Sequence, residues 1–186
     1  MIYIIRHGQT ELNTRHVLQG RSDHPLNENG RSQAAQAAEL LRDVSFSCVY
    51  SSPLIRAVQT AEIAAPGIPV TVDERLIEMD YGPYEGTDLN DPPAEVIAFF
   101  KDFVHCPAPE GMEPLDKIVQ RAGEFLEEHC RTGEDILVST HAIAMKGLLE
   151  YLTPDSGGSF WSKYIGNCAI YTTDYVDGAF RIPEEL

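Results

Sequence analysis

The sequence has few cysteines, and none of them is placed like a metal ligand. Its four cysteines are spread widely along the 186 residues, as Cys48, Cys106, Cys130 and Cys168. No Cys-x-x-Cys pair occurs, and no cysteine–histidine cluster has the spacing of a zinc site. We therefore expect free thiols in a reducing compartment and no bound metal.

Long apolar runs are also missing. No segment approaches the roughly 18 apolar residues that a membrane helix needs. The amino-terminal run at residues 2–5 is too short for a signal peptide, and no basic segment precedes it. Because internal repeats and linker-like stretches are absent too, we predict one cytoplasmic domain over residues 1–186, with no membrane partner.

Positive charge is scarce, since 14 Lys and Arg face 29 Asp and Glu and leave a net charge of −15. A chain with this balance repels nucleic-acid phosphates, so we expect no nucleic-acid partner. The shortage is uneven, because residues 1–56 hold six arginines and five acidic residues. An anionic ligand would therefore find its cations in the first third of the chain.

Short apolar runs alternate with helical patterns along the chain. We expect strands at residues 2–5, 48–50, 68–72, 135–140, 167–173 and 175–182, with a hairpin around Thr173-Asp174. We expect helices after the segment Asn27-Glu28-Asn29-Gly30, at residues 54–64, at 95–104, from Pro114 onward and at 142–152, and a loop at 79–93. This order predicts an α/β three-layer sandwich, with a mostly parallel central sheet and helices on both faces.

Reactive side chains gather where three of these strands end. Arg6 and His7 follow the first strand, Arg56 begins the helix after the second, and His141 follows residues 135–140. If these strands are parallel neighbours, two arginines and two histidines meet at one edge of the sheet. Paired guanidiniums suit a phosphate, the N–H of Ala142 at a helix start adds an anion donor, and a facing imidazole can be a nucleophile.

One family shows these residues in this order. Arg6-His7-Gly8-Gln9-Thr10-Glu11-Leu12-Asn13 resembles the signature of the histidine phosphatase superfamily, also called the phosphoglycerate mutase-like family. The resemblance continues through residues 51–61, Leu76-Ile77-Glu78 and Ser139-Thr140-His141, and it spans residues 1–150. Gln9 and Leu12 depart from the commonest residues, and neither departure removes a catalytic residue type.

The resemblance implies that His7 attacks phosphorus and becomes phosphohistidine. The carbonyl of Gly8 would hold the proton of the other ring nitrogen. Arg6, Arg56 and His141 would surround the transferred group and neutralise its oxygens, so that no metal or other cofactor is required.

The resemblance also implies a leaving-group side of the pocket. Asn13 would add a neutral donor to the transferred group, and Gln19 and Gly20 would line the pocket near the leaving group. Glu78 is the candidate general acid, which would protonate the departing alkoxide and then activate water. Glu11 and Glu85 stay open as weaker candidates for that role.

The family contains both hydrolases and mutases. The mutases carry a longer, basic segment before the last histidine, whereas residues 79–140 here hold four cations and fourteen acids. We therefore expect hydrolysis of a small phosphomonoester through phosphohistidine. A phosphoglycerate mutase and a non-catalytic phosphate-binding regulatory module are the alternatives, and the organic half of the substrate and the oligomeric state stay open.

Overall fold

A six-stranded sheet forms the centre of the molecule. The computed structural model describes all 186 residues. The strands lie in the order β3 (Val70–Val72), β2 (Cys48–Ser51), β4 (Ile136–Thr140), β1 (Ile2–Arg6), β5 (Ile170–Thr173) and β8 (Glu184–Glu185). The first four of these are mutually parallel, whereas β5 runs antiparallel to β1 and β8 antiparallel to β5. The expected mostly parallel sheet is confirmed.

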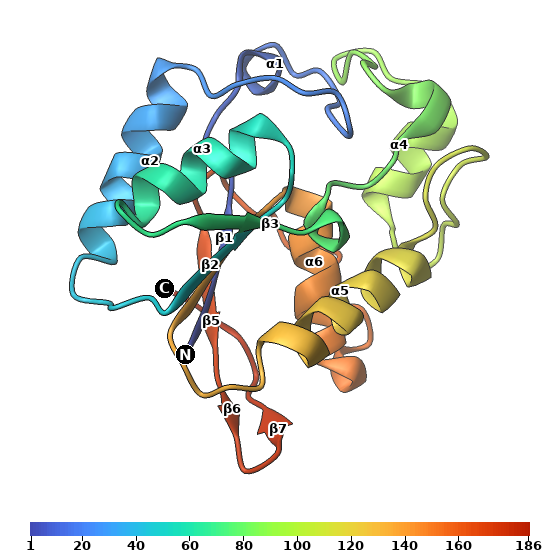
Figure 1. Cartoon of the computed structure of the whole chain (residues 1–186). Helices are drawn as coiled ribbons and strands as arrows, with labels where there is room; N and C mark the ends of the chain where they lie inside the picture. The colour runs from blue at the N-terminus through green and yellow to red at the C-terminus, as the bar shows by residue number, and fades with distance from the viewer.

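Helices cover both faces of this sheet (Figure 1). The helices are α1 (Glu11–Thr14), α2 (Glu28–Leu40), α3 (Ile55–Ala64), α4 (Ala94–Lys101), α5 (Leu115–His129) and α6 (Ala142–Leu152). Single 3-10 turns are η1 (Glu74–Leu76), η2 (Gly82–Tyr84) and η3 (Pro154–Ser156). Apolar residues of α2 and α3 pack with Ile5 and Leu137, whereas those of α5 and α6 pack with Ile4 and Val138. Successive strand residues point to opposite faces, so β1 and β4 are buried on both.

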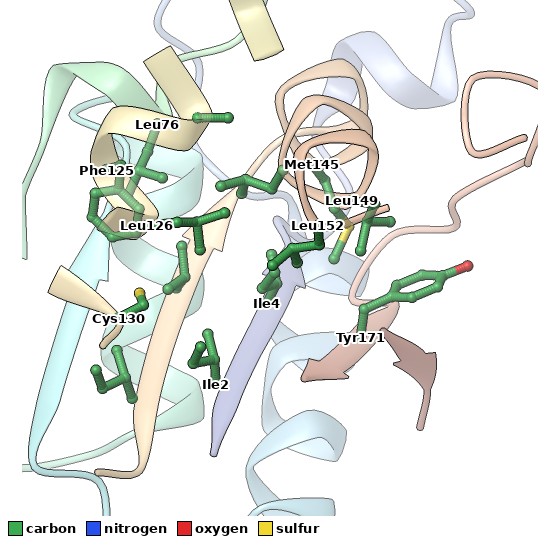
Figure 2. Close-up of a cluster of buried hydrophobic side chains, with 14 of the residues drawn as sticks. Ile2, Ile4, Leu76, Phe125, Leu126, Cys130, Met145, Leu149, Leu152 and Tyr171 are labelled. Atoms are coloured by element: carbon green, nitrogen blue, oxygen red, sulfur yellow. The ribbon is translucent and has the colours of Figure 1, made fainter. Parts of the chain in front are cut away.

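The face under α5 and α6 carries the largest core cluster (Figure 2). Phe125 and Leu126 of α5 meet Met145 and Leu149 of α6 above Ile4, and all five side chains are fully buried. Each such side chain contributes about 1.5–3 kcal/mol by leaving water. This packing fixes α6, whose first turn lies at the carboxyl end of β4.

A separate aromatic cluster stands beside that end of the sheet. Phe99 of α4 packs edge-to-face on Phe103 at 4.8 Å between ring centroids, and Trp161 stacks on Phe103 at 6.1 Å. Met79 and Tyr81 complete the same buried group. The irregular segment at residues 79–93 and the chain after η3 are therefore held together by aromatic packing.

The end of the chain differs from the expectation. Residues 175–182 do not form one strand but a small hairpin of β6 (Tyr175–Val176) and β7 (Ala179–Phe180). Its turn is Asp177-Gly178, where both residues have positive φ values of 54° and 84°. The prediction of a hairpin turn at Thr173-Asp174 is therefore wrong. Asp-Gly is a favoured two-residue hairpin turn, so the dipeptide Asp177-Gly178 is a local sequence signal for the turn that forms.

Some boundaries also shift. β5 begins at Ile170 rather than at residue 167, because Cys168 has a φ of 56° and interrupts extended backbone. Helix α4 ends at Lys101 rather than at residue 104. The short α1 and the edge strand β8 were not expected from the sequence.

Candidate active site

The carboxyl ends of β1, β4 and β2 lie side by side at one edge of the sheet. Arg6 is paired with Thr140 in the parallel register, and the N–H of His7 donates to the Thr140 carbonyl at 2.9 Å. On the other side of β4, the N–H of Ser52 donates to the Ser139 carbonyl at 3.0 Å. The residues that follow these three strands therefore meet, as expected from the sequence.

Gly8 is required by the close packing of the loop after β1. A Cβ atom on Gly8 would overlap the carbonyl of Gly30 at the start of α2, and one on Gly30 would overlap the backbone of Gln9. The N–H of Gly8 donates to Thr60 Oγ1 at 3.0 Å. This packing fixes the Gly8 carbonyl beside the ring of His7.

His7 is held in one tautomer. Its Nδ1 lies 2.7 Å from the carbonyl oxygen of Gly8, so Nδ1 carries the proton and donates it, and Nε2 is bare. Burial, followed by the nearby charges of Arg6 and Arg56, holds the pKa of His7 well below its usual value. His7 is therefore a neutral imidazole at neutral pH.

His141 is held in the opposite tautomer. The Nε–H of Arg56 donates to its Nδ1 at 3.2 Å, and its Nε2 lies 2.7 Å from the hydroxyl oxygen of Ser52. Burial and then Arg56 and His7 hold the pKa of His141 well below its usual value. The ring of His141 lies 5.1 Å from that of His7, measured between centroids.

Arg56 is fully buried and braces the loop that follows α1. Its terminal nitrogens donate to the carbonyls of Gly20 at 2.6 Å and Ser22 at 2.7 Å. Burial lowers the pKa of Arg56 to about 10, which leaves it charged at neutral pH. Gly20 therefore contributes a carbonyl to Arg56, and its N–H binds the Glu85 carboxylate at 3.0 Å. That contact gives Glu85 a structural place in the same loop.

Two buried donors in the molecule have no acceptor, and both belong to this site. They are Nε of Arg6 and Nε2 of Gln19. The oxygen of the Gln19 amide accepts from the Thr10 hydroxyl at 2.7 Å, which directs its nitrogen elsewhere. An unsatisfied buried donor costs about 1–3 kcal/mol, so this pair indicates a ligand rich in acceptor oxygens.

Asn13 presents its amide in a similar way. Its side-chain oxygen accepts from the N–H of Thr10 at 3.0 Å and lies 3.4 Å from the amide nitrogen of Asn167. Both contacts use the oxygen, and the NH₂ group is left to donate. Asn167 also donates to the carbonyl of His7 at 3.0 Å and so braces the loop after β1.

Glu78 is buried and receives three N–H donors. Its Oε1 accepts from Met79 at 2.9 Å and from Ala144 at 3.0 Å, and its Oε2 accepts from Ile143 at 3.3 Å. Ile143 and Ala144 belong to the first turn of α6, where the helix dipole favours negative charge. Glu78 thus binds the start of α6 from a different part of the chain, with Ala142 beside it.

These side chains border a cleft of about 440 Å³. Six of the predicted site residues line it, namely Arg6, His7, Asn13, Gln19, Glu78 and Ala142. Arg56, His141 and Gly20 do not line it, because they lie behind this layer and are joined by the hydrogen bonds described above. Aromatic side chains also line the cleft, namely Tyr81, Phe100, Phe103, Trp161 and Tyr164.

Three lysines of the cleft were not predicted from the sequence. Lys101, Lys146 and Lys163 line it together with Arg6, and Glu78 is the one acidic residue among the lining residues. A chain of net charge −15 therefore has a cationic cleft. The count of cations in residues 79–140 does not indicate a cationic cleft, since Lys146 and Lys163 lie outside that span. Lys146 follows Ala142 by four residues, a spacing that places both on one helix face.

No group of three or more His, Cys, Asp or Glu side chains is arranged to hold a metal ion. No helix is long and apolar enough to cross a bilayer. The cationic side chains that line the cleft are those of Arg6, Lys101, Lys146 and Lys163.

Known proteins share this sequence pattern and this architecture. A probable phosphoglycerate mutase GpmB of Salmonella choleraesuis is 32% identical over 94% of this chain and 84% of its own length. The structure of Bacillus stearothermophilus YhfR is 31% identical with a TM-score of 0.82, covering 97% of this chain and 94% of that one. Phosphoserine phosphatase of Entamoeba histolytica in complex with 3-phosphoglyceric acid is 26% identical with a TM-score of 0.84, covering 99% and 95%.

The family model of the histidine phosphatase superfamily, branch 1, matches residues 2–184. This match covers nearly the whole chain and includes the segments whose strand ends form the cleft. The chain therefore belongs to branch 1 of the histidine phosphatase superfamily.

Proposed function

We propose that the protein hydrolyses small phosphomonoesters through a phosphohistidine on His7. The observation that carries this proposal is the hydrogen bond between Nδ1 of His7 and the Gly8 carbonyl, which leaves Nε2 bare in the cleft. A neutral imidazole with a free nitrogen is a nucleophile, and the lowered pKa of His7 keeps it neutral. Solved structures similar to this chain include phosphatases, which supports a small phosphorylated substrate.

The phosphate would be bound by the donors that lack partners. Nε of Arg6 and Nε2 of Gln19 would donate to its oxygens, and the NH₂ of Asn13 would add a neutral donor. Arg56 and His141 would act from the layer behind, where the guanidinium of Arg56 adds fixed positive charge. These groups would stabilise charge on the transferred phosphoryl group without a metal.

The reaction would proceed in two steps. In the first, Nε2 of His7 bonds to phosphorus while the ester P–O bond breaks, and Glu78 gives a proton to the departing alkoxide oxygen. In the second, Glu78 takes a proton from water, the water oxygen bonds to phosphorus, and the P–N bond to His7 breaks. Oε2 of Glu78 is the oxygen best suited to carry the proton, because it has one long contact at 3.3 Å whereas Oε1 has two shorter ones.

Residues 79–140, where the mutases carry a basic segment, add little positive charge to the cleft, and this favours hydrolysis over transfer between two positions of a retained substrate. Of the four cations in residues 79–140, only Lys101 lines the cleft. Arg121 pairs with Glu113, and Arg131 pairs with Glu127, so neither is free for a substrate. A phosphoglycerate mutase is the second candidate, supported by the 32% identity to GpmB. A phosphate-binding module without turnover is disfavoured, since the five catalytic candidates all meet at this edge of the sheet.

Release of inorganic phosphate from 4-nitrophenyl phosphate tests this function. We expect turnover, together with an acid-labile, alkali-stable radiolabelled phosphoenzyme, and His7→Ala should abolish both. His105→Ala is a matched control, because His105 is exposed and its side chain forms hydrogen bonds only with Asp102. Turnover that persists in His7→Ala would refute the assignment. Interconversion of 2- and 3-phosphoglycerate faster than phosphate release would replace hydrolysis by the mutase reaction.

A further inference from the structure

We propose that Lys146 determines substrate specificity by binding a carboxylate on the organic half of the phosphomonoester, an inference that rests on the proposed phosphatase function. Lys146 lies on the face of α6 that begins with Ala142, and both residues line the cleft. The two residues are four positions apart in the helix, which places them about 6 Å apart along the helix axis. A group bound by Lys146 would thus lie beyond the phosphate, toward the rest of the substrate.

Lys146 is buried without a carboxylate partner. Its side chain is 8% exposed, its Nζ donates to the Trp161 carbonyl at 2.6 Å, and Nζ lies 4.8 Å from the centroid of the Phe103 ring. No acidic oxygen lies within 4.0 Å of its ammonium, although the chain has 29 acidic residues. A buried cation without a direct ion-pair partner is costly, and ammonium has three donors of which one is used. The remaining donors would be satisfied by an anionic group of a bound substrate.

The other two lysines of the cleft are placed differently. Lys101 and Lys163 are both exposed, and the ammonium of Lys163 lies over the Phe160 ring at 4.7 Å. They contribute long-range positive charge at the rim. Lys146 is held in place by Trp161 and Phe103 and is therefore the cation that can select one group in one position.

A carboxylate fits this position better than a second phosphate. Lys146 offers two free N–H donors and a single charge, and Glu78 and Glu150 are near enough to raise its pKa. Two acidic neighbours oppose a dianion more strongly than a monoanion. The aromatic wall beside Lys146, with Phe103 and Trp161, would cover the short carbon chain between the two anionic groups.

Lys146 also has a structural contact that the test must separate from substrate binding. The backbone of Trp161 is held by two α6 side chains, since its carbonyl accepts from Lys146 and its N–H donates to Glu150 at 3.1 Å. Loss of that support would disturb the cleft wall for every substrate. Loss of a carboxylate contact would affect only substrates that carry a carboxylate.

The experiment compares two substrates that differ at one group. 3-Phosphoglycerate carries a carboxylate where glycerol 3-phosphate carries a hydroxymethyl group, and 4-nitrophenyl phosphate serves as a substrate without either. We expect Lys146→Met to lower kcat/KM for 3-phosphoglycerate by on the order of 10- to 100-fold, mainly through KM. Glycerol 3-phosphate and 4-nitrophenyl phosphate should change by less than about 3-fold. Lys117→Met is the matched control, because it removes the same charge from an exposed position outside the cleft.

The wild-type enzyme gives a second readout that needs no variant. Burial and Arg6 lower the pKa of Lys146, Glu78 and Glu150 oppose this, and the result is about 8. The ammonium therefore loses its charge as the pH rises through about 8. The preference for 3-phosphoglycerate over glycerol 3-phosphate should fall over that range in the wild type and stay flat in Lys146→Met.

The outcomes separate this inference from the proposed function. An absence of wild-type turnover on 4-nitrophenyl phosphate would overturn the phosphatase proposal itself. Turnover with no preference for the carboxylate, or equal losses on all three substrates in Lys146→Met, would leave hydrolysis intact and refute the role of Lys146. If Lys146→Met does not fold, the wild-type pH dependence of the preference decides.

Discussion

The Nε–H of Arg56 donates to Nδ1 of His141 across 3.2 Å, and this contact fixes where the histidine carries its proton. A guanidinium cannot accept a hydrogen bond, so Nδ1 of His141 must be the acceptor. The proton then lies on Nε2, which faces the Ser52 hydroxyl. His7 has the reverse arrangement, with its proton on Nδ1. The two rings therefore present different nitrogens, and only His7 has a bare nitrogen in the cleft.

Nitrogen-15 NMR of the histidine rings should show these opposite tautomers near neutral pH. We expect a protonated Nδ1 in His7, a protonated Nε2 in His141, and no titration of either ring near its ordinary pKa of about 6.5. Arg56→Met should raise the pKa of His141, because it removes a positive charge from the ring. A doubly protonated His141 at pH 7 in the wild type would contradict the interpretation.

The same two histidines should make the fold less stable in mild acid. Their folded pKa values lie below those of the unfolded chain, so below about pH 6.5 the unfolded chain binds protons that the folded protein does not. The free energy of unfolding should therefore decrease as the pH is lowered, by up to about 1.4 kcal/mol per pH unit for each histidine. Urea unfolding between about pH 7 and pH 5.5 measures this slope.

His141→Gln provides the comparison for that measurement. Glutamine keeps an oxygen that can accept from Arg56 but does not titrate, so the slope of stability against pH should be reduced by about half. An unfolding free energy that is the same at pH 7 and pH 5.5 in the wild type would show that neither histidine is held neutral.

The strand ends could be predicted from the sequence because each signal is local. Apolar runs at β1, β2 and β4 are followed directly by Arg6, Ser52 and His141, and parallel neighbours bring such ends together. Which of these residues line the cleft, and which lie behind the lining residues, could not be predicted in this way. Whether Arg56 lines the cleft or lies behind it depends on the Gly20 and Ser22 carbonyls that it contacts.

The position of Lys146 in the cleft could not be predicted from the sequence for a related reason. Lys146 is one of two charged residues in a mostly apolar helix, and its spacing from Ala142 gives only the face on which it lies. What covers that face is the segment around Trp161, which arrives from later in the chain and is held by aromatic packing with Phe103. Contacts between segments distant in sequence have no local pattern. The hairpin turn at Asp177-Gly178 is different, since its dipeptide is a recognised signal.

We expect activity to persist in EDTA. In the proposed mechanism Arg6 and Arg56 would supply the positive charge that a metal would otherwise bring to a phosphoryl group. Phosphate release from 4-nitrophenyl phosphate should be unchanged within error after chelation and gel filtration, and added Mg²⁺ or Zn²⁺ should not increase it. Loss of activity in EDTA that is restored by one divalent ion would overturn metal independence.

The role of Glu78 as general acid can be separated from its binding of α6. A Gln side chain can keep an oxygen for the N–H groups of Met79 and Ala144. The free energy of unfolding of Glu78→Gln should therefore lie within about 1 kcal/mol of the wild-type value. It has no acidic proton to give. An alkyl phosphate leaves as a basic alkoxide and needs that proton, whereas 4-nitrophenyl phosphate leaves as a stabilised phenolate.

Single-turnover phosphorylation of His7 is the step to measure, since activation of water by Glu78 complicates steady-state rates. Glu78→Gln should slow phosphorylation by alkyl phosphates by on the order of 10²–10⁴ and by 4-nitrophenyl phosphate far less. Glu11→Gln and Glu85→Gln are the controls. Glu85→Gln should destabilise the loop at Gly20, because the N–H of Gly20 donates to the Glu85 carboxylate. Equal losses for both leaving groups would show that Glu78 only shapes the cleft and holds α6. The proton would then have to come from another group, and Glu11 or Glu85 would be the next residue to test.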